Sequence, residues 1–179
     1  MVSASRPTLR DRAGALVTAA LSTRATAALP TDLALVVVRT VLAWIFIYYG
    51  AGKLFGWFHG LGIHQTAIYF ANTAHLHPGE FFAVLGGLTE FGGGIAMALG
   101  VGSRLVGFAL FGDMVMAMIT VTWANGINSE KLPAGYELNL ALGALALVVT
   151  LFGAGRFSLD ALAEHRLAGV KSRSPGCPA

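Results

Sequence analysis

Residues 81–100 read FFAVLGGLTEFGGGIAMALG, and Glu90 is the only charged side chain in this stretch. About 20 predominantly apolar residues form a helix long enough to cross the hydrocarbon core of a bilayer. The other reading of the glycines, a phosphate-binding loop, requires a strand-to-helix turn followed by a lysine, which this stretch lacks. The stretch therefore predicts a membrane-spanning helix with a carboxylic acid near its middle.

The composition of the whole chain agrees with a membrane protein. Of the 179 residues, 55% are hydrophobic and 12% are charged, whereas about a quarter of a soluble domain is charged. Three further segments are apolar enough to span a bilayer: Leu33–Leu54, Leu105–Ala124 and Tyr136–Gly153. We therefore expect an all-α fold, an integral membrane four-helix bundle over residues 33–155, with an N-terminal arm at 1–32 and a tail at 156–179.

Basic side chains indicate the orientation of this bundle. The arm, the tail and the short loop between the second and third spans are rich in arginine and lysine, whereas Lys131 is the only basic residue of the opposite loops outside the spans. Loops rich in Lys and Arg stay in the cytoplasm, so we expect both termini to be cytoplasmic. The alanine-, glycine- and arginine-rich composition suits a bacterium, and we expect a multi-pass protein of the bacterial plasma membrane.

The first outer loop, residues 55–79, is too short to span the membrane and too apolar for a simple loop. Its apolar positions, including Ile63, Ile68 and Phe70, predict a short helix that lies in the interface. His64 belongs to this loop and is a candidate for binding. The loop histidines show no metal-ligand spacing, so we expect no metal site and find no haem or flavin motif. The single cysteine excludes an internal dithiol pair, and no basic-aromatic pattern indicates nucleic acid.

Five ionisable residues lie inside the predicted spans or at their edges: Arg39, Lys53, Glu90, Asp113 and Glu137. A charged side chain at the centre of a membrane helix costs at least ~2.5–3.5 kcal/mol unless it is paired or hydrated. We expect Arg39 to meet Glu90 or Asp113, and Lys53 to meet Glu137. One acid then remains without a cation, and we expect Glu90 and Asp113 to share its proton.

The spacing of small residues indicates which faces meet. Gly86, Glu90 and Gly94 follow one another at intervals of four and share a helix face, where small residues let another backbone approach. Arg39, Glu90 and Asp113 are accordingly our candidates for a catalytic proton network, and Lys53, Glu137 and His64 for binding. The alternative is that the ion pairs only fix the register of the helices.

Four segments in order resemble the DoxX family of small membrane proteins: YYGAGKLFGWF at 48–58, GIHQTAIYFANTAHLHP at 62–78, TEFGGGIAMALGVGSRLVG at 89–107 and GAGRFSLD at 153–160. The resemblance runs from about Arg39 to Asp160. It implies a four-helix membrane protein, and because the family includes a subunit of a thiosulfate:quinone oxidoreductase, it also implies redox chemistry, a quinone and redox protein partners.

Three functions are compatible with these residues. The first is a membrane subunit associated with an oxidoreductase system, quinone-linked or docking redox partners; whether it is itself an enzyme stays open. The second is a non-enzymatic membrane scaffold for assembly. The third is a small transporter or proton conduit, which would need a homo-oligomer because four spans are few for a transporter. Membrane lipids are partners in every case.

Overall fold

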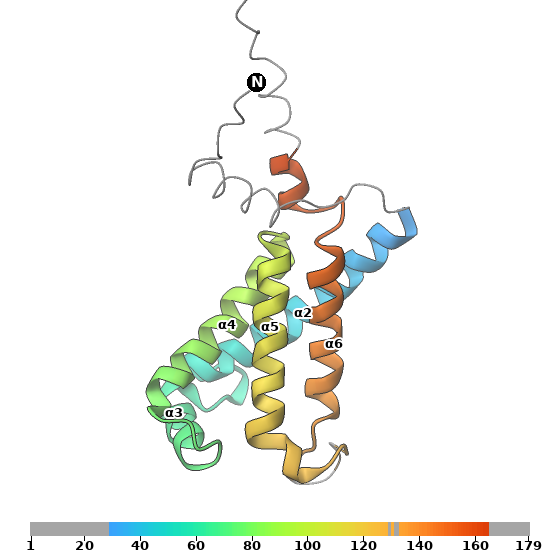
Figure 1. The fold of residues 1–179 in the computed structure, drawn as a ribbon. Coiled ribbons are helices and arrows are strands. Elements are labelled where there is room, and N and C mark those ends of the chain that lie inside the picture. The colour runs from blue at the N-terminus through green and yellow to red at the C-terminus, as the bar shows by residue number, and fades with distance from the viewer. Residues whose placement is uncertain (1–28, 129, 131–132, 165–179) are drawn as a thin grey trace, which may run out of the picture.

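The computed structural model describes residues 29–128, 130 and 133–164, and every regular element in these ranges is helical (Figure 1). Most of the predicted N-terminal arm, residues 1–28, and most of the predicted tail lie outside the described residues. The elements follow in this order: α2 (Leu29–Phe55), η1 (Trp57–His59), α3 (Gly62–Asn72), α4 (Gly79–Leu99), α5 (Ser103–Ala117), η2 (Met118–Thr122), η3 (Trp123–Asn125) and α6 (Glu137–Phe152). The predicted all-α fold is confirmed for this part of the chain.

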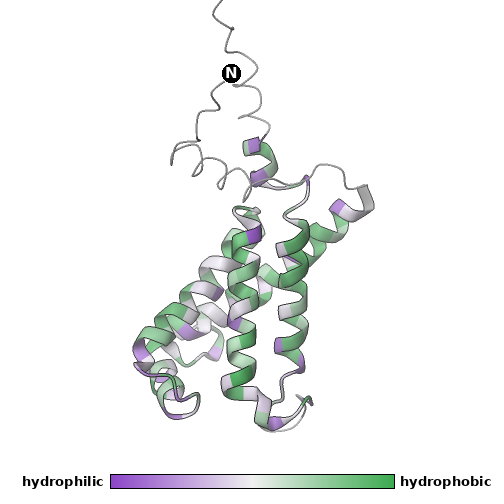
Figure 2. Cartoon of the chain, in the orientation of Figure 1, coloured by the Kyte–Doolittle hydropathy of each residue, from purple (hydrophilic) through white to green (hydrophobic). Residues whose placement is uncertain are grey.

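Three helical stretches are long and apolar enough to cross a membrane, and they correspond to the first three predicted spans: Thr31–Phe55, Gly79–Leu99 and Ser103–Asn125. Helix α6 is apolar but has 16 residues, so it extends about 24 Å against a hydrocarbon core of ~30 Å. Large apolar side chains such as Trp44 (77% exposed) and Leu105 (65% exposed) face outward, and Figure 2 shows that hydrophobic residues predominate along the helices. The chain is a helical membrane protein.

The helices associate in two pairs. Helix α2 packs chiefly against α4, and α5 packs chiefly against α6; the first pair runs obliquely to the upright second pair in Figure 1. Glycines allow both contacts, because a Cβ atom at Gly94 would lie 3.1 Å from the carbonyl oxygen of Ala43, and one at Gly107 would lie 2.9 Å from that of Ala146. The close approach predicted for Gly94 is therefore confirmed.

The helices enclose a small apolar core, while most of their surface faces outward. Each of the four long helices contributes nearly fully buried residues to one cluster: Leu42 and Phe46 from α2, Met97 from α4, Leu110 from α5 and Val149 from α6. This cluster contains residues of both helix pairs and holds the pairs together.

Helix α3 packs on α4 at one end of the bundle, together with the turn η1 (Figure 1). We call this the α3 end, and the opposite end, where Arg39 lies, the Arg39 end. The described chain both begins and finishes at the Arg39 end. Helix α3 presents Thr66 and Ala67 to the protein and leaves Ile63, Ile68 and Tyr69 exposed, as an amphipathic helix does at an interface. A short helix in this loop is thus confirmed.

Candidate functional site

An ion pair inside the bundle joins Lys53 and Glu90. Lys53 lies in the last turn of α2 and Glu90 in the middle of α4; Lys53 Nζ donates a hydrogen bond to Glu90 Oε1 at 2.6 Å. The side chain of Glu90 is 3% exposed and that of Lys53 is 27% exposed. Lysine can place its apolar stem along the helices and still bring its ammonium group to a partner, and this is how the pair spans α2 and α4.

This pairing corrects two expectations from the sequence. Arg39 was expected to meet Glu90 or Asp113, and Lys53 was expected to meet Glu137, but Lys53 and Glu90 pair with each other. The expectations placed each charge by helix rise along a common axis. Helix α2 instead packs against α4 in a register that places Gly50 beside Phe91, so that the end of α2 faces the middle of α4.

Asp113 of α5 joins the pair to form a three-residue group. Its carboxyl group interacts electrostatically with both Glu90 and Lys53. One oxygen of each acid, Asp113 Oδ2 and Glu90 Oε2, is buried without a hydrogen-bond partner among the described residues. We call Lys53, Glu90 and Asp113 the lysine–carboxylate cluster. It brings together one cation and two acids; the sharing of a proton between Glu90 and Asp113 stays a prediction.

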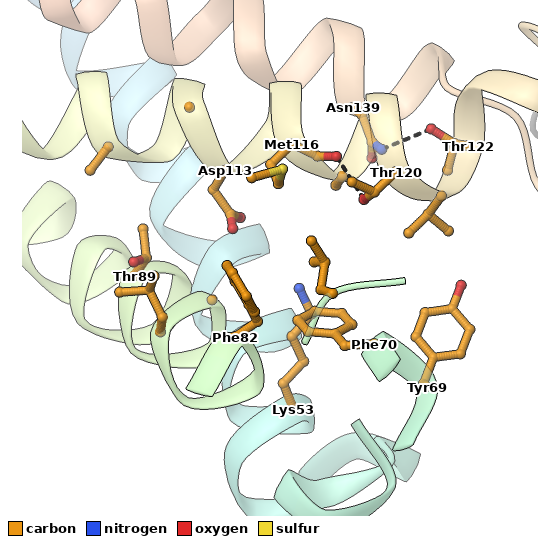
Figure 3. A pocket seen from close by; sticks show the side chains of 17 residues that line it. Lys53, Tyr69, Phe70, Phe82, Thr89, Asp113, Met116, Thr120, Thr122 and Asn139 are labelled. Carbon is orange, nitrogen blue, oxygen red and sulfur yellow. Dashed lines mark hydrogen bonds between the residues drawn. The ribbon is translucent and has the colours of Figure 1, made fainter. Parts of the chain in front are cut away.

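A cavity of about 440 Å³ adjoins this cluster, between α3, α4 and α5. Lys53 and Asp113 line it, whereas Glu90 lies outside the lining as their partner. Figure 3 shows both side chains directed into the cavity. Gly86 leaves this space open, because a Cβ atom there would lie 3.7 Å from both Asp113 Oδ1 and the ring of Phe70. The glycine that was expected to admit a neighbouring backbone therefore faces the cavity instead.

The remaining lining divides into apolar walls and a neutral polar end. Phe70, Phe82 and Met116 contribute apolar surface. Thr120, Thr122 and Asn139 lie together away from Asp113 in Figure 3. The cavity, which we call the inner cavity, can therefore hold an apolar ring between hydrogen-bonding groups.

The neutral polar end is built by a π-helical turn, Met118–Thr122, that continues α5. Thr120 Oγ1 donates to the carbonyl oxygen of Met116 at 2.8 Å, and Asn139 Nδ2 donates to Thr122 Oγ1 at 3.2 Å. π-Turns inside helices are frequent at functional sites. The sequence analysis missed this turn; the available signal was the run ITVT, whose β-branched residues and hydroxyl groups favour departures from α-helical geometry.

Arg39 belongs to a different site at the Arg39 end. It is 4% exposed and donates to four carbonyl groups, those of Met97 (3.0 Å), Ala98 (3.1 Å), Ala154 (2.7 Å) and Phe157 (3.0 Å). The last carbonyls of a helix lack partners within the helix and carry partial negative charge, so a guanidinium fork satisfies the end of α4 and the chain after α6. Lys53 is fourteen residues further along α2, or about 21 Å by helix rise. The expected contact of Arg39 with Glu90 or Asp113 is therefore wrong.

The segment GAGRFSLD completes the Arg39 end. Asp160 accepts hydrogen bonds from the backbone N–H groups of Gly102 (2.8 Å) and Ser103 (3.0 Å), and so caps the N-terminus of α5 from outside that helix. Asp32 Oδ1 accepts from the N–H of Arg156 at 3.1 Å. Together these contacts tie α2, α4, α5 and the chain after α6 to one another.

The other two candidate binding residues lie apart from the inner cavity. Glu137 is exposed at the start of α6, where its N–H donates to the carbonyl oxygen of Ile127 at 3.2 Å. An acid at this position suits the positive end of the helix dipole. His64 is exposed on α3 and is not part of the cavity lining. The structure does not bring either residue to the lysine–carboxylate cluster.

Comparison with protein families gives one match. The model of the family described as DoxX matches residues 34–123, half of the chain. This range includes all three members of the lysine–carboxylate cluster and Arg39. Searches of curated proteins and of solved structures found no match.

Proposed function

This chain belongs to the DoxX family of membrane proteins, and on that premise we propose that it is a membrane subunit of an oxidoreductase system that binds a quinone-class molecule in the inner cavity. The observation that supports the proposal most strongly is the position of the lysine–carboxylate cluster on the wall of a largely apolar cavity among membrane-spanning helices. We also propose that α6 is the fourth span, and that both termini face the cytoplasm of a bacterium.

The chemistry of the cavity lining fits a molecule that combines a flat apolar ring with oxygen atoms. Phe70, Phe82 and Met116 offer apolar surface to the ring. The ammonium group of Lys53 carries three N–H donors, one of which bonds to Glu90. The unpartnered oxygen of Asp113 can accept a hydrogen bond from a hydroxyl group, or donate one to a carbonyl oxygen when the acid is protonated.

Within this proposal Lys53 and Asp113 have separate tasks. Lys53 keeps Glu90 in place and presents an N–H group to a ligand oxygen. Asp113 holds a proton or releases it at its free carboxylate oxygen. When bound, a quinone supplies two-electron, two-proton chemistry, with a docked redox protein as the electron donor or acceptor. The surrounding apolar side chains exclude water from the exchange.

The direct test is equilibrium binding of menadione to the purified protein in lipid nanodiscs. We expect saturable binding that Asp113→Ala weakens by about fivefold, because protonated Asp113 donates to a carbonyl oxygen of menadione and a hydrogen bond between neutral groups contributes ~0.5–1.5 kcal/mol. Glu137→Gln removes a carboxyl group outside the cavity and should change the affinity less than twofold, since it has no contact with the ligand. The absence of saturable binding to the unaltered protein would contradict the proposal.

A second candidate function is a scaffold that recruits redox proteins without binding a quinone. The tied Arg39 end favours it, because four segments meet there around buried charged groups. If the protein is a scaffold, Glu90→Gln should lower the stability of the protein or the recovery of its complexes. Menadione binding should then be absent from both the unaltered protein and Glu90→Gln. Affinity capture from membranes, compared between the unaltered protein and Glu90→Gln, separates the two functions.

A further inference from the structure

A second cavity, of about 320 Å³, lies at the α3 end beside the inner cavity. It is formed by the end of α2, the turn η1 and helix α3, and we call it the outer cavity. Its most prominent lining residues are aromatic: Tyr48, Tyr49, Trp57, Phe58, Tyr69 and Phe70.

The turn η1 folds back onto α2 to form one side of the outer cavity. Phe58 and His59 have φ angles of 55° and 65°, in the left-handed region that side chains other than glycine rarely adopt. Gly60 lies against the backbone of Gly52, which leaves no space for a side chain at residue 60. In this conformation the Phe58 ring stacks on Tyr48, with ring centroids 4.9 Å apart and an interplanar angle of 20°. The backbone therefore holds an aromatic ring in place at the cavity wall.

The two cavities share a wall. Lys53, Tyr69 and Phe70 line both of them, and Lys53 Nζ lies 5.9 Å from the centroid of the Phe70 ring. Exposure decreases from the outer cavity toward the cluster: Trp57 is 56% exposed and Tyr69 38%, whereas the side chain of Glu90 is 3% exposed. The outer cavity is thus open to the surroundings, and its inner wall is the Lys53–Phe70 pair.

We infer that the outer cavity is a second binding chamber for a flat, ring-bearing apolar molecule, through which that molecule reaches the inner cavity past Phe70. Aromatic side chains bind flat rings in offset or edge-to-face arrangements, and the stacked Tyr48–Phe58 pair provides such a surface. Lys53 can donate to a ligand oxygen from either chamber. This inference rests on the proposed function, because it assigns the same class of ligand to both cavities.

Trp57 provides a reporter for the outer cavity. A protein with Trp44→Phe and Trp123→Phe retains Trp57 as its only tryptophan, and menadione bound nearby will quench its fluorescence. We expect quenching that saturates. The matched reporter carries Trp57→Phe and Trp123→Phe and retains Trp44, which is 77% exposed on α2 and not part of either lining. Its quenching should rise linearly with menadione in the lipid, without saturation.

Two substitutions on the Trp57 reporter separate this inference from the proposed function. Phe58→Leu removes the stacked ring and should weaken the saturable quenching by about fivefold. Phe55→Leu is its control, because Phe55 contacts Trp57 with ring centroids 5.1 Å apart but does not line the outer cavity. Gly86→Leu places a side chain in the inner cavity next to Phe70 and Asp113; it should reduce total binding and leave the quenching of Trp57 intact.

The outcomes are distinguishable. Linear quenching of Trp57, together with menadione binding that Gly86→Leu reduces, would overturn the outer chamber and leave the inner site supported. Equal effects of Phe58→Leu and Phe55→Leu would also overturn it. If neither the unaltered protein nor any variant binds menadione saturably, the proposed function and the assignment of the outer cavity as a binding chamber are both wrong.

Discussion

The most informative perturbation of the cluster is Lys53→Met, which removes the cation and keeps an apolar side chain of similar length. At the observed separation of 2.6 Å, two unit charges attract by about 6 kcal/mol when the effective dielectric constant is ~20. Burying the two ions costs several kcal/mol each, so the intact pair is close to neutral in its net effect. Glu90, with its side chain 3% exposed, cannot regain full hydration once Lys53 is absent.

We therefore expect Lys53→Met to lower the free energy of unfolding by ~3–5 kcal/mol, the usual result of leaving one buried charge without its partner. Unfolding in mixed micelles with increasing dodecyl sulfate, followed by circular dichroism, measures the difference.

A double-mutant cycle tests the physical reason. In Lys53→Met with Glu90→Gln, residue 90 no longer carries a charge without a partner, and only Asp113 still loses the cation; the double variant should therefore lose less stability than Lys53→Met alone. Glu137→Gln is the control, because the sequence predicts a pair between Glu137 and Lys53 that the structure does not contain. This substitution should change the free energy of unfolding by less than ~0.5 kcal/mol. Two results would refute the account of a buried pair. One is a free energy of unfolding for Lys53→Met within ~1 kcal/mol of that of the unaltered protein; the other is strictly additive effects of the two substitutions.

Three further predictions concern packing and the Arg39 end. Arg39→Lys keeps the charge but cannot reproduce a fork to four carbonyls, so thermal unfolding should show a loss of ~2–4 kcal/mol with menadione affinity changed less than twofold; a large loss of affinity would place Arg39 in the binding site after all. Asp160→Ala removes the cap of α5 and should cost ~0.5–2 kcal/mol in the same assay, whereas an unchanged midpoint would show that the cap adds nothing. Gly94→Leu should prevent the close approach of α2 and α4, whereas Gly92→Leu, with no atom within 4 Å of its Cβ position, should fold normally; equal yields of folded protein would contradict the packing.

The sequence was sufficient to predict the positions of the helices and part of the lysine–carboxylate cluster. The apolar runs predicted three of the spans within a few residues, because length and hydropathy are local properties. The meeting of Glu90 with Asp113 also followed from the cost of burying unpaired acids. These results depend on individual helices and on a simple charge rule, and not on how the helices are tilted.

The partners of Lys53 and Arg39 could not be predicted in the same way. Their positions along α2 were correct, but the register in which α2 packs against α4 decides that Lys53 faces Glu90. Arg39 binds backbone carbonyls, which leave no signature in a search for opposite charges. An arginine near the end of a span, facing a short loop and a helix C-terminus, is the pattern that could have indicated them.

The central claim, that a quinone-class molecule occupies the inner cavity, is tested most directly by photolabelling. The protein in nanodiscs is irradiated with an azidoquinone, and the labelled residues are identified by mass spectrometry. The account predicts labels on the cavity side of residues 112–122, at Met116 above all, that excess menadione suppresses. Labels distributed over outward-facing residues such as Trp44 and Leu105, and unaffected by menadione, would contradict it.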